Sequence, residues 1–169
     1  IFTLIVMFLI SKRERRKNDN LSGVLMLDKN MNEGSVISFS VPGTKEGAVE
    51  ASEKVQAFCE ENEMSPKLSI SLPLAIEELL VVMAEKSLSN DPDKYSDVRI
   101  FINNEDVLLR IRCAGALFDP IEWYRTRQSE LSNGDFLSDK SIGIKLISER
   151  SKQVEFNRTF GVNNLLAVL

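Results

Sequence analysis

Residues 97–120 read DVRIFINNEDVLLRIRCAGALFDP, and this stretch decides the fold. It contains two runs, residues 97–103 and 106–113, in which apolar and polar side chains alternate as they do in half-buried β-strands. The connection between the runs is short and polar, which is typical of a hairpin. We therefore predict a pair of antiparallel strands at this point of the chain.

A strand and two helices are predicted on the amino-terminal side of this hairpin. Residues 35–41 alternate between apolar and polar side chains, as expected for another half-buried strand. Residues 45–62 place apolar side chains on one helical face at spacings of three and four, and so do residues 67–88. Pro73 is compatible with the second helix only if it lies in the opening turn.

The carboxyl-terminal side contributes further helices and strands. Asp119 and Pro120 predict the start of a short helix, whereas residues 125–140 are polar and without period, which indicates a mobile loop. Residues 142–150 are predicted to form a short helix, and residues 152–169 two closing strands. This order predicts an α+β fold, a two-layer sandwich with a mostly antiparallel sheet covered on one face by helices.

The first ten residues, IFTLIVMFLI, are apolar except for Thr3, and the basic segment SKRERRK follows directly. Because a spanning helix needs about 20 apolar residues, we interpret residues 1–10 as the end of a truncated transmembrane helix. A buried strand or helix start is the alternative. Positive charge just beyond a span marks its cytoplasmic side. We therefore expect residues 11–34 to be a basic juxtamembrane segment and linker, and residues 35–169 to be a domain on the cytoplasmic face of the cell membrane.

The remainder of the chain is acidic. Residues 11–17 hold five of the 21 basic residues and one of the 25 acidic residues, which leaves 16 and 24 in residues 18–169, a net charge of −8. Binding of nucleic acid requires a basic face, so we expect no nucleic-acid partner, and anionic lipid headgroups explain the basic segment. The chain has two cysteines and no histidine, from which we expect reduced thiols and no zinc site.

Three segments carry the candidate chemistry: IEELLVVMAEKS at residues 76–87, RCAGALFDP at residues 112–120, and SIGIKLIS at residues 141–148. In this order they resemble the nucleotide pocket of GHKL-type ATPases. That fold is shared by sensor histidine kinases, gyrase-type topoisomerases, MutL-like repair proteins and anti-sigma-factor serine kinases. The likeness is greatest to the anti-sigma-factor serine kinases and covers roughly residues 35–169.

In the first segment, the resemblance implies that Glu78 orients or deprotonates an attacking hydroxyl, and that an asparagine one turn later binds magnesium. Val82 stands at the asparagine position and offers no oxygen ligand, so we expect no protein anchor for Mg²⁺. Lys86 stands one further turn along, where the family often has a basic residue, and it could still face a phosphate. The simpler interpretation is that Glu77 and Glu78 form the solvated edge of an amphipathic helix.

In the second segment, the resemblance implies an aspartate that accepts a hydrogen bond from adenine and a glycine beside the base. Cys113 replaces the aspartate, while Gly115 and Phe118 match the pattern. A thiol is a weak acceptor, and losing a hydrogen bond of ~1.5–3 kcal/mol weakens binding roughly 10–150-fold. In the third segment, two glycines would open a helix whose amides hold the phosphates. Ser141 replaces the first glycine and could cap the helix, and Gly143 remains.

These substitutions predict an ATP site that is weak or lost, with Glu78 as the candidate catalytic residue and no metal ligand. The candidate nucleotide-binding residues are Glu78, Val82, Lys86, Cys113, Gly115, Phe118, Ser141 and Gly143. Our leading hypothesis is a regulatory or partner-binding domain of anti-sigma-kinase-like fold that is not an enzyme. It would be tethered to a bacterial membrane protein of the efflux-transporter type, and its partner would be a regulatory protein or that membrane domain. Two alternatives stay open: an active ATP-dependent serine kinase, and a structural module that forms a homodimer.

Overall fold

The computed structural model of the chain describes residues 34–103, 106–131 and 141–169. The expectations for residues 1–10 and for almost all of the linker fall outside these ranges. In chain order the elements are β1 (Ser35–Pro42), α2 (Lys45–Glu61), α3 (Pro66–Met83), the π-helical turn η1 (Ala84–Leu88), β2 (Tyr95–Asn103), β3 (Asp106–Ala114), α4 (Pro120–Leu131), α5 (Ile142–Arg150), β4 (Gln153–Thr159) and β5 (Val162–Val168). Within the described ranges, no helix combines the length and the apolar character that a membrane span requires.

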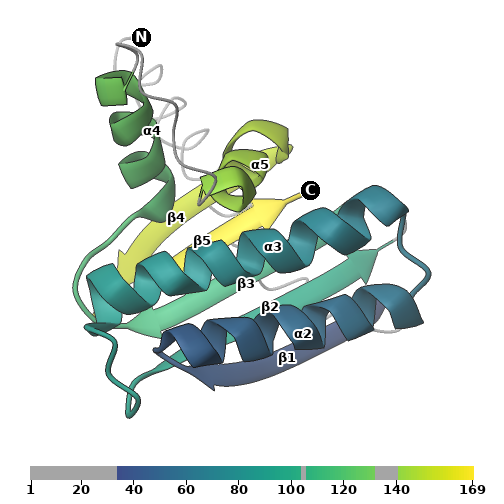
Figure 1. The fold of residues 1–169 in the computed structure, drawn as a ribbon, viewed down its shortest axis with the longest axis horizontal. Coiled ribbons are helices and arrows are strands. Elements are labelled where there is room, and N and C mark those ends of the chain that lie inside the picture. Colours follow the sequence, from purple (N-terminus) through teal and green to yellow (C-terminus); the bar gives the residue numbers. More distant parts are fainter. Residues whose placement is uncertain (1–33, 104–105, 132–140) are drawn as a thin grey trace, which may run out of the picture. The chain divides into compact units, whose positions relative to one another are not determined.

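The strands form one sheet in the order β1-β2-β3-β5-β4. Neighbouring strands run antiparallel (Figure 1). Asn103 of β2 pairs with Asp106 of β3, which confirms the predicted hairpin. The hairpin of β4 and β5 turns at Phe160 and Gly161, whose φ angles are both positive, 51° and 78°. Tight hairpin turns use such left-handed conformations, which glycine adopts without steric strain.

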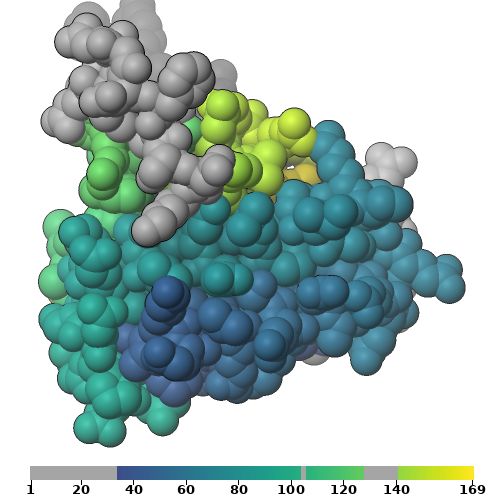
Figure 2. Space-filling view, in the orientation of Figure 1, coloured from purple at the N-terminus to yellow at the C-terminus, as the bar shows by residue number. Residues whose placement is uncertain are grey.

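The helices α2, α3 and α5 lie on one face of the sheet (Figure 1). Side chains of α2 and α3 form a continuous surface over that face in the space-filling view (Figure 2). This arrangement confirms the predicted two-layer α+β sandwich with an antiparallel sheet covered on one face. Both predicted helices between β1 and β2 are present as well.

The core lies between this face of the sheet and α3. Alternate residues of the three central strands point into it and are fully buried: Val98, Ile100, Leu109, Ile111, Leu165 and Ala167. They meet an apolar face of α3 that includes Ile76, Leu79 and Met83, also fully buried. Burying each large apolar side chain stabilises the fold by roughly 1.5–3 kcal/mol. The alternation in the strands and the spacing in the helix thus determine which faces meet.

The predicted helix at residues 67–88 needs two corrections. The α-helix ends at Met83 and a π-helical turn continues to Leu88, after which the N–H of Ser89 donates to the Ala84 carbonyl. Pro73 is the eighth of the 18 residues of α3 and therefore lies inside the helix, not in its opening turn. A proline at such a position removes one helical hydrogen bond and costs about 3 kcal/mol. The burial of the neighbouring apolar side chains offsets this cost.

The prediction of a mobile loop from residue 125 is wrong for its first part, because α4 continues to Leu131. Asp119 caps this helix, since its Oδ1 accepts the N–H groups of Ile121 at 2.9 Å and Glu122 at 3.1 Å. Residues 125–131, RTRQSEL, are largely good helix formers and include no glycine or proline. Apolar periodicity was the wrong criterion for the end of this helix. Helix propensity and the Asp119 cap stabilise it without a periodic apolar pattern after Tyr124. The rest of the predicted loop lies outside the described residues.

We expect Leu109→Ala to destabilise the 169-residue chain by about 2–5 kcal/mol, because it leaves a cavity between the central strand and α3. Leu117→Ala is the matched control, since Leu117 is 66% exposed and surface truncations usually change stability by less than about 0.5 kcal/mol. Urea unfolding followed by circular dichroism measures both. Equal losses for the two variants would contradict the placement of the core.

Candidate functional site

The first and third sequence motifs meet directly in the structure. Glu78 projects from α3 toward the start of α5, where its Oε2 accepts the N–H of Gly143 at 2.6 Å and that of Ile144 at 3.2 Å. Amides at the start of a helix have no partner within the helix and carry a partial positive charge. The resemblance assigns these amides to phosphates. In the structure a carboxylate of the same chain occupies them.

The backbones of α3 and α5 pass each other closely at this contact. A Cβ atom added at Gly143 would lie 2.4 Å from the Ala75 Cα and 2.9 Å from the Leu74 carbonyl oxygen. Glycine is therefore needed here for packing between helices. Ser141 occupies the N-cap position of α5, but its side chain makes no capping hydrogen bond. The expected capping role of Ser141 is wrong, because the Glu78 carboxylate caps the helix instead.

Burial raises the pKa of Glu78 above its ordinary value of 4.5. The amide N–H groups of Ile144, Gly143 and Ile142 oppose this rise, and the negative charge of Glu77 adds to it. The hydrogen bonds thus only partly offset the loss of hydration.

The second motif lies in a different, buried cluster. Cys113 of β3 is 2% exposed, and its Sγ lies 3.6 Å from the Oγ of Ser87 in η1. The Asn163 Nδ2 of β5 donates to Ser87 Oγ at 2.8 Å and to the Ala116 carbonyl at 2.7 Å. Ser87 Oγ donates to the same carbonyl at 2.8 Å. The position of the implied adenine acceptor is therefore enclosed by groups of the chain itself.

Gly115 completes this cluster through its backbone. A Cβ atom added there would lie 2.3 Å from the Ser87 carbonyl oxygen. The same oxygen accepts the Ala116 N–H at 2.9 Å. The Ser87 carbonyl of the π-helical turn η1 thus lies against Gly115, where the resemblance implies an adenine base.

Sequence reasoning missed Ser87 and Asn163. Asn163 is fully buried, and its Oδ1 has no hydrogen-bond partner. Asn163 lies on the same face of β5 as the inward-facing Leu165 and Ala167, so a polar residue at an inward position was a signal that could have been used. Ser87 follows the buried Met83 by four residues and continues that helical face.

The other predicted site residues do not gather around these two clusters. Val82 is half-buried and packs against the core. Lys86 is exposed and pairs with Glu85, the Nζ to Oε1 distance being 2.8 Å. Phe118 packs against the core and Trp123, with ring centroids 6.1 Å apart.

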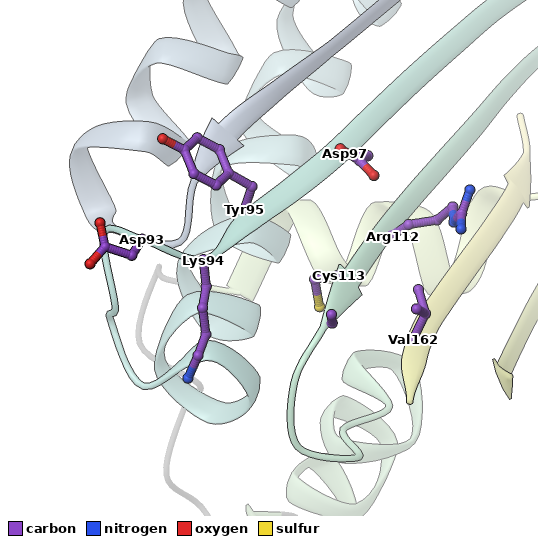
Figure 3. A pocket seen from close by; sticks show the side chains of 8 residues that line it. Asp93, Lys94, Tyr95, Asp97, Arg112, Cys113 and Val162 are labelled. Atoms are coloured by element: carbon purple, nitrogen blue, oxygen red, sulfur yellow. The ribbon is translucent and has the colours of Figure 1, made fainter. Parts of the chain in front are cut away.

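A pocket of about 370 Å³ lies at the end of the sheet where β2 begins and β3 ends (Figure 3). Asp93 and Asp97 line it together with Lys94 and Arg112. The charges of these two acidic and two basic side chains sum to zero. Cys113 is the one predicted site residue among its lining residues.

In the described residues, the three motifs make contacts within the chain. No group of three or more His, Cys, Asp or Glu side chains that could hold a metal ion occurs in this part of the chain. Val82 offers no ligand, Cys113 is enclosed, and the amides of Gly143 and Ile144 are bonded to Glu78. Each of the three motifs thus differs from the pattern in its contacts as well as in its residue types.

Comparison with known proteins adds information about the fold. No family model matches the sequence, and no curated protein matches it either. A chain in the crystal structure of the SiaB-SiaC complex from Pseudomonas aeruginosa is similar, with a TM-score of 0.56 and 12% sequence identity. The match covers 89% of this chain and 99% of that chain. The two chains therefore share a fold.

The raised pKa of Glu78 predicts a pH dependence of stability. The folded state binds the proton of the Glu78 carboxyl group more tightly than the unfolded state does. Glu78 therefore stabilises the fold most below its ordinary pKa of 4.5, and this contribution is lost as the pH rises through the raised pKa. We expect the unfolding free energy of the wild type, relative to Glu78→Gln, to fall with rising pH across this window. Urea unfolding of both proteins over a pH series measures it. A relative stability that rises with pH would show that the amides lower the pKa instead.

Both thiols should be protected in the folded chain. Burial raises the pKa of Cys59 to about 11 and also raises that of Cys113, although hydrogen bonds with Ser87 and Asn163 oppose the latter. Since the thiolate is the reactive form, we expect slow reaction with Ellman's reagent at about pH 8. Denaturant should release two thiols per chain. Rapid modification of Cys113 in the native protein would contradict the enclosure of the second motif.

Proposed function

We propose that this domain is regulatory, that it binds a protein partner, and that it has an anti-sigma-kinase-like fold with a closed nucleotide pocket. The observation that carries the proposal is the enclosure of Cys113, which is 2% exposed and hydrogen-bonded to Ser87. An adenine base would have to displace Ser87, which is also bonded to Ala116. Breaking several buried hydrogen bonds without replacement costs about 1–3 kcal/mol for each group left unsatisfied.

The shared fold supports the regulatory part of the proposal. The matching chain comes from a crystal structure of a complex of two proteins, SiaB and SiaC. A domain that keeps such a fold, while its nucleotide motifs make contacts within the chain, is suited to binding a protein. We infer a protein partner for this domain on the same ground.

We further propose that residues 1–17 attach the domain to the cytoplasmic face of a membrane. The apolar run of residues 1–10, interrupted only by Thr3, and the five basic residues that follow it support this attachment. Anionic headgroups would attract the basic segment. Association of the chain with vesicles containing phosphatidylserine, but not with neutral vesicles at the same ionic strength, would distinguish attraction by charge from insertion of the apolar segment.

The proposal predicts that the 169-residue chain does not bind ATP with Mg²⁺ at micromolar concentrations. Isothermal titration calorimetry with ATP, with and without Mg²⁺, measures this directly. An active serine kinase that uses Glu78 as base would bind ATP in a metal-dependent manner, and that result would overturn the proposal. Size-exclusion chromatography with light scattering on the same sample tests the dimerisation alternative, which a monomer would contradict.

A further inference from the structure

The contact between Glu78 and α5 joins groups that are distant in the sequence. The carboxylate belongs to a residue 65 positions before Gly143, and one oxygen accepts both amides, at 2.6 Å from Gly143 and 3.2 Å from Ile144. A side chain from another helix thus supplies an anion to the positive end of α5. Glu77, its neighbour, forms no such bond to another described residue and affects Glu78 through its charge.

The same two N–H groups cannot serve a second acceptor in this geometry. A phosphate oxygen and a carboxylate oxygen need the same donor directions at a helix start. The two helices also cannot separate to make room without losing contact, because Gly143 packs on the Ala75 backbone with no space for a Cβ atom. A phosphate could therefore bind the amides of Gly143 and Ile144 only if the Glu78 carboxylate left them.

We propose that Glu78 is an internal ligand that occupies the anion position at the start of α5 and keeps phosphate out. This role replaces the catalytic role that the resemblance implies for Glu78. It rests on the closed pocket of the proposed function and names the group that closes its phosphate end. The hydrogen bonds from the amides only partly offset the burial of the Glu78 carboxylate. Holding this carboxylate at the start of α5 therefore costs free energy of hydration.

The test is the response of thermal stability to inorganic phosphate at neutral pH. In Glu78→Ala the two amides lose their ligand and become available. Above the Kd for phosphate, we expect the Tm of this variant to rise by about 3–6 °C for each tenfold increase in phosphate. The wild type should show only the small general effect of a stabilising salt.

Glu77→Ala is the matched control, because it removes a carboxylate from the adjacent position without freeing Gly143 or Ile144. Its Tm should follow the wild type over the same phosphate series, with sodium chloride balancing the ionic strength. If Glu78→Ala does not fold, Glu78→Met keeps the length of the side chain and removes both oxygen acceptors. In that variant, phosphate should shift the amide NMR resonances of Gly143 and Ile144, and in the wild type it should not.

Equal phosphate responses in the wild type, Glu77→Ala and Glu78→Ala would overturn this inference. So would resonances of Gly143 and Ile144 that phosphate leaves unchanged in Glu78→Met. Both results are separate from the fate of the proposed function, which fails if the wild type binds ATP with Mg²⁺. A wild type that binds ATP while only the Glu78 variants respond to phosphate would overturn the proposed function and leave the internal ligand standing.

Discussion

The packing of α3 on α5 is the contact around which the Glu78 cluster is arranged. It has a polar component, the Glu78 carboxylate on two helix-start amides, and a steric one, the bare backbone of Gly143 against Ala75. Each component requires the other. The carboxylate reaches the amides because the backbones approach closely, and α5 can start there because its free donors find an acceptor.

The helix α3 and the turn η1 that continues it contribute to both clusters. Glu78 serves the start of α5, and Ser87 serves the end of β3 together with Asn163. One face of α3 between them forms the core with the sheet. A change in the position of this helix would therefore disturb the core and both polar clusters together.

The order and the type of most elements could be predicted from local patterns. Alternation in residues 97–113 indicated the hairpin, and the proline and aspartate at residues 119–120 indicated the start of α4. The extent of α4 and the place of Pro73 inside α3 could not be predicted in this way. The extent of α4 depends on helix propensity and on the Asp119 cap, which stabilise the helix beyond the last apolar position of the periodic pattern. The place of Pro73 depends on the burial of neighbouring side chains, which outweighs the cost of a proline inside a helix.

By itself, the sequence determined the two-layer fold, the acidic character of the domain, and the residue types that stand at the three motifs. It also indicated that Val82 has no ligand for a metal, because that follows from the chemistry of one side chain. Only the tertiary structure decided what Glu78 and Cys113 contact. Their partners lie on segments far along the chain, and hydrogen bonds at helix starts or between paired strands depend on distances that residue spacing does not specify.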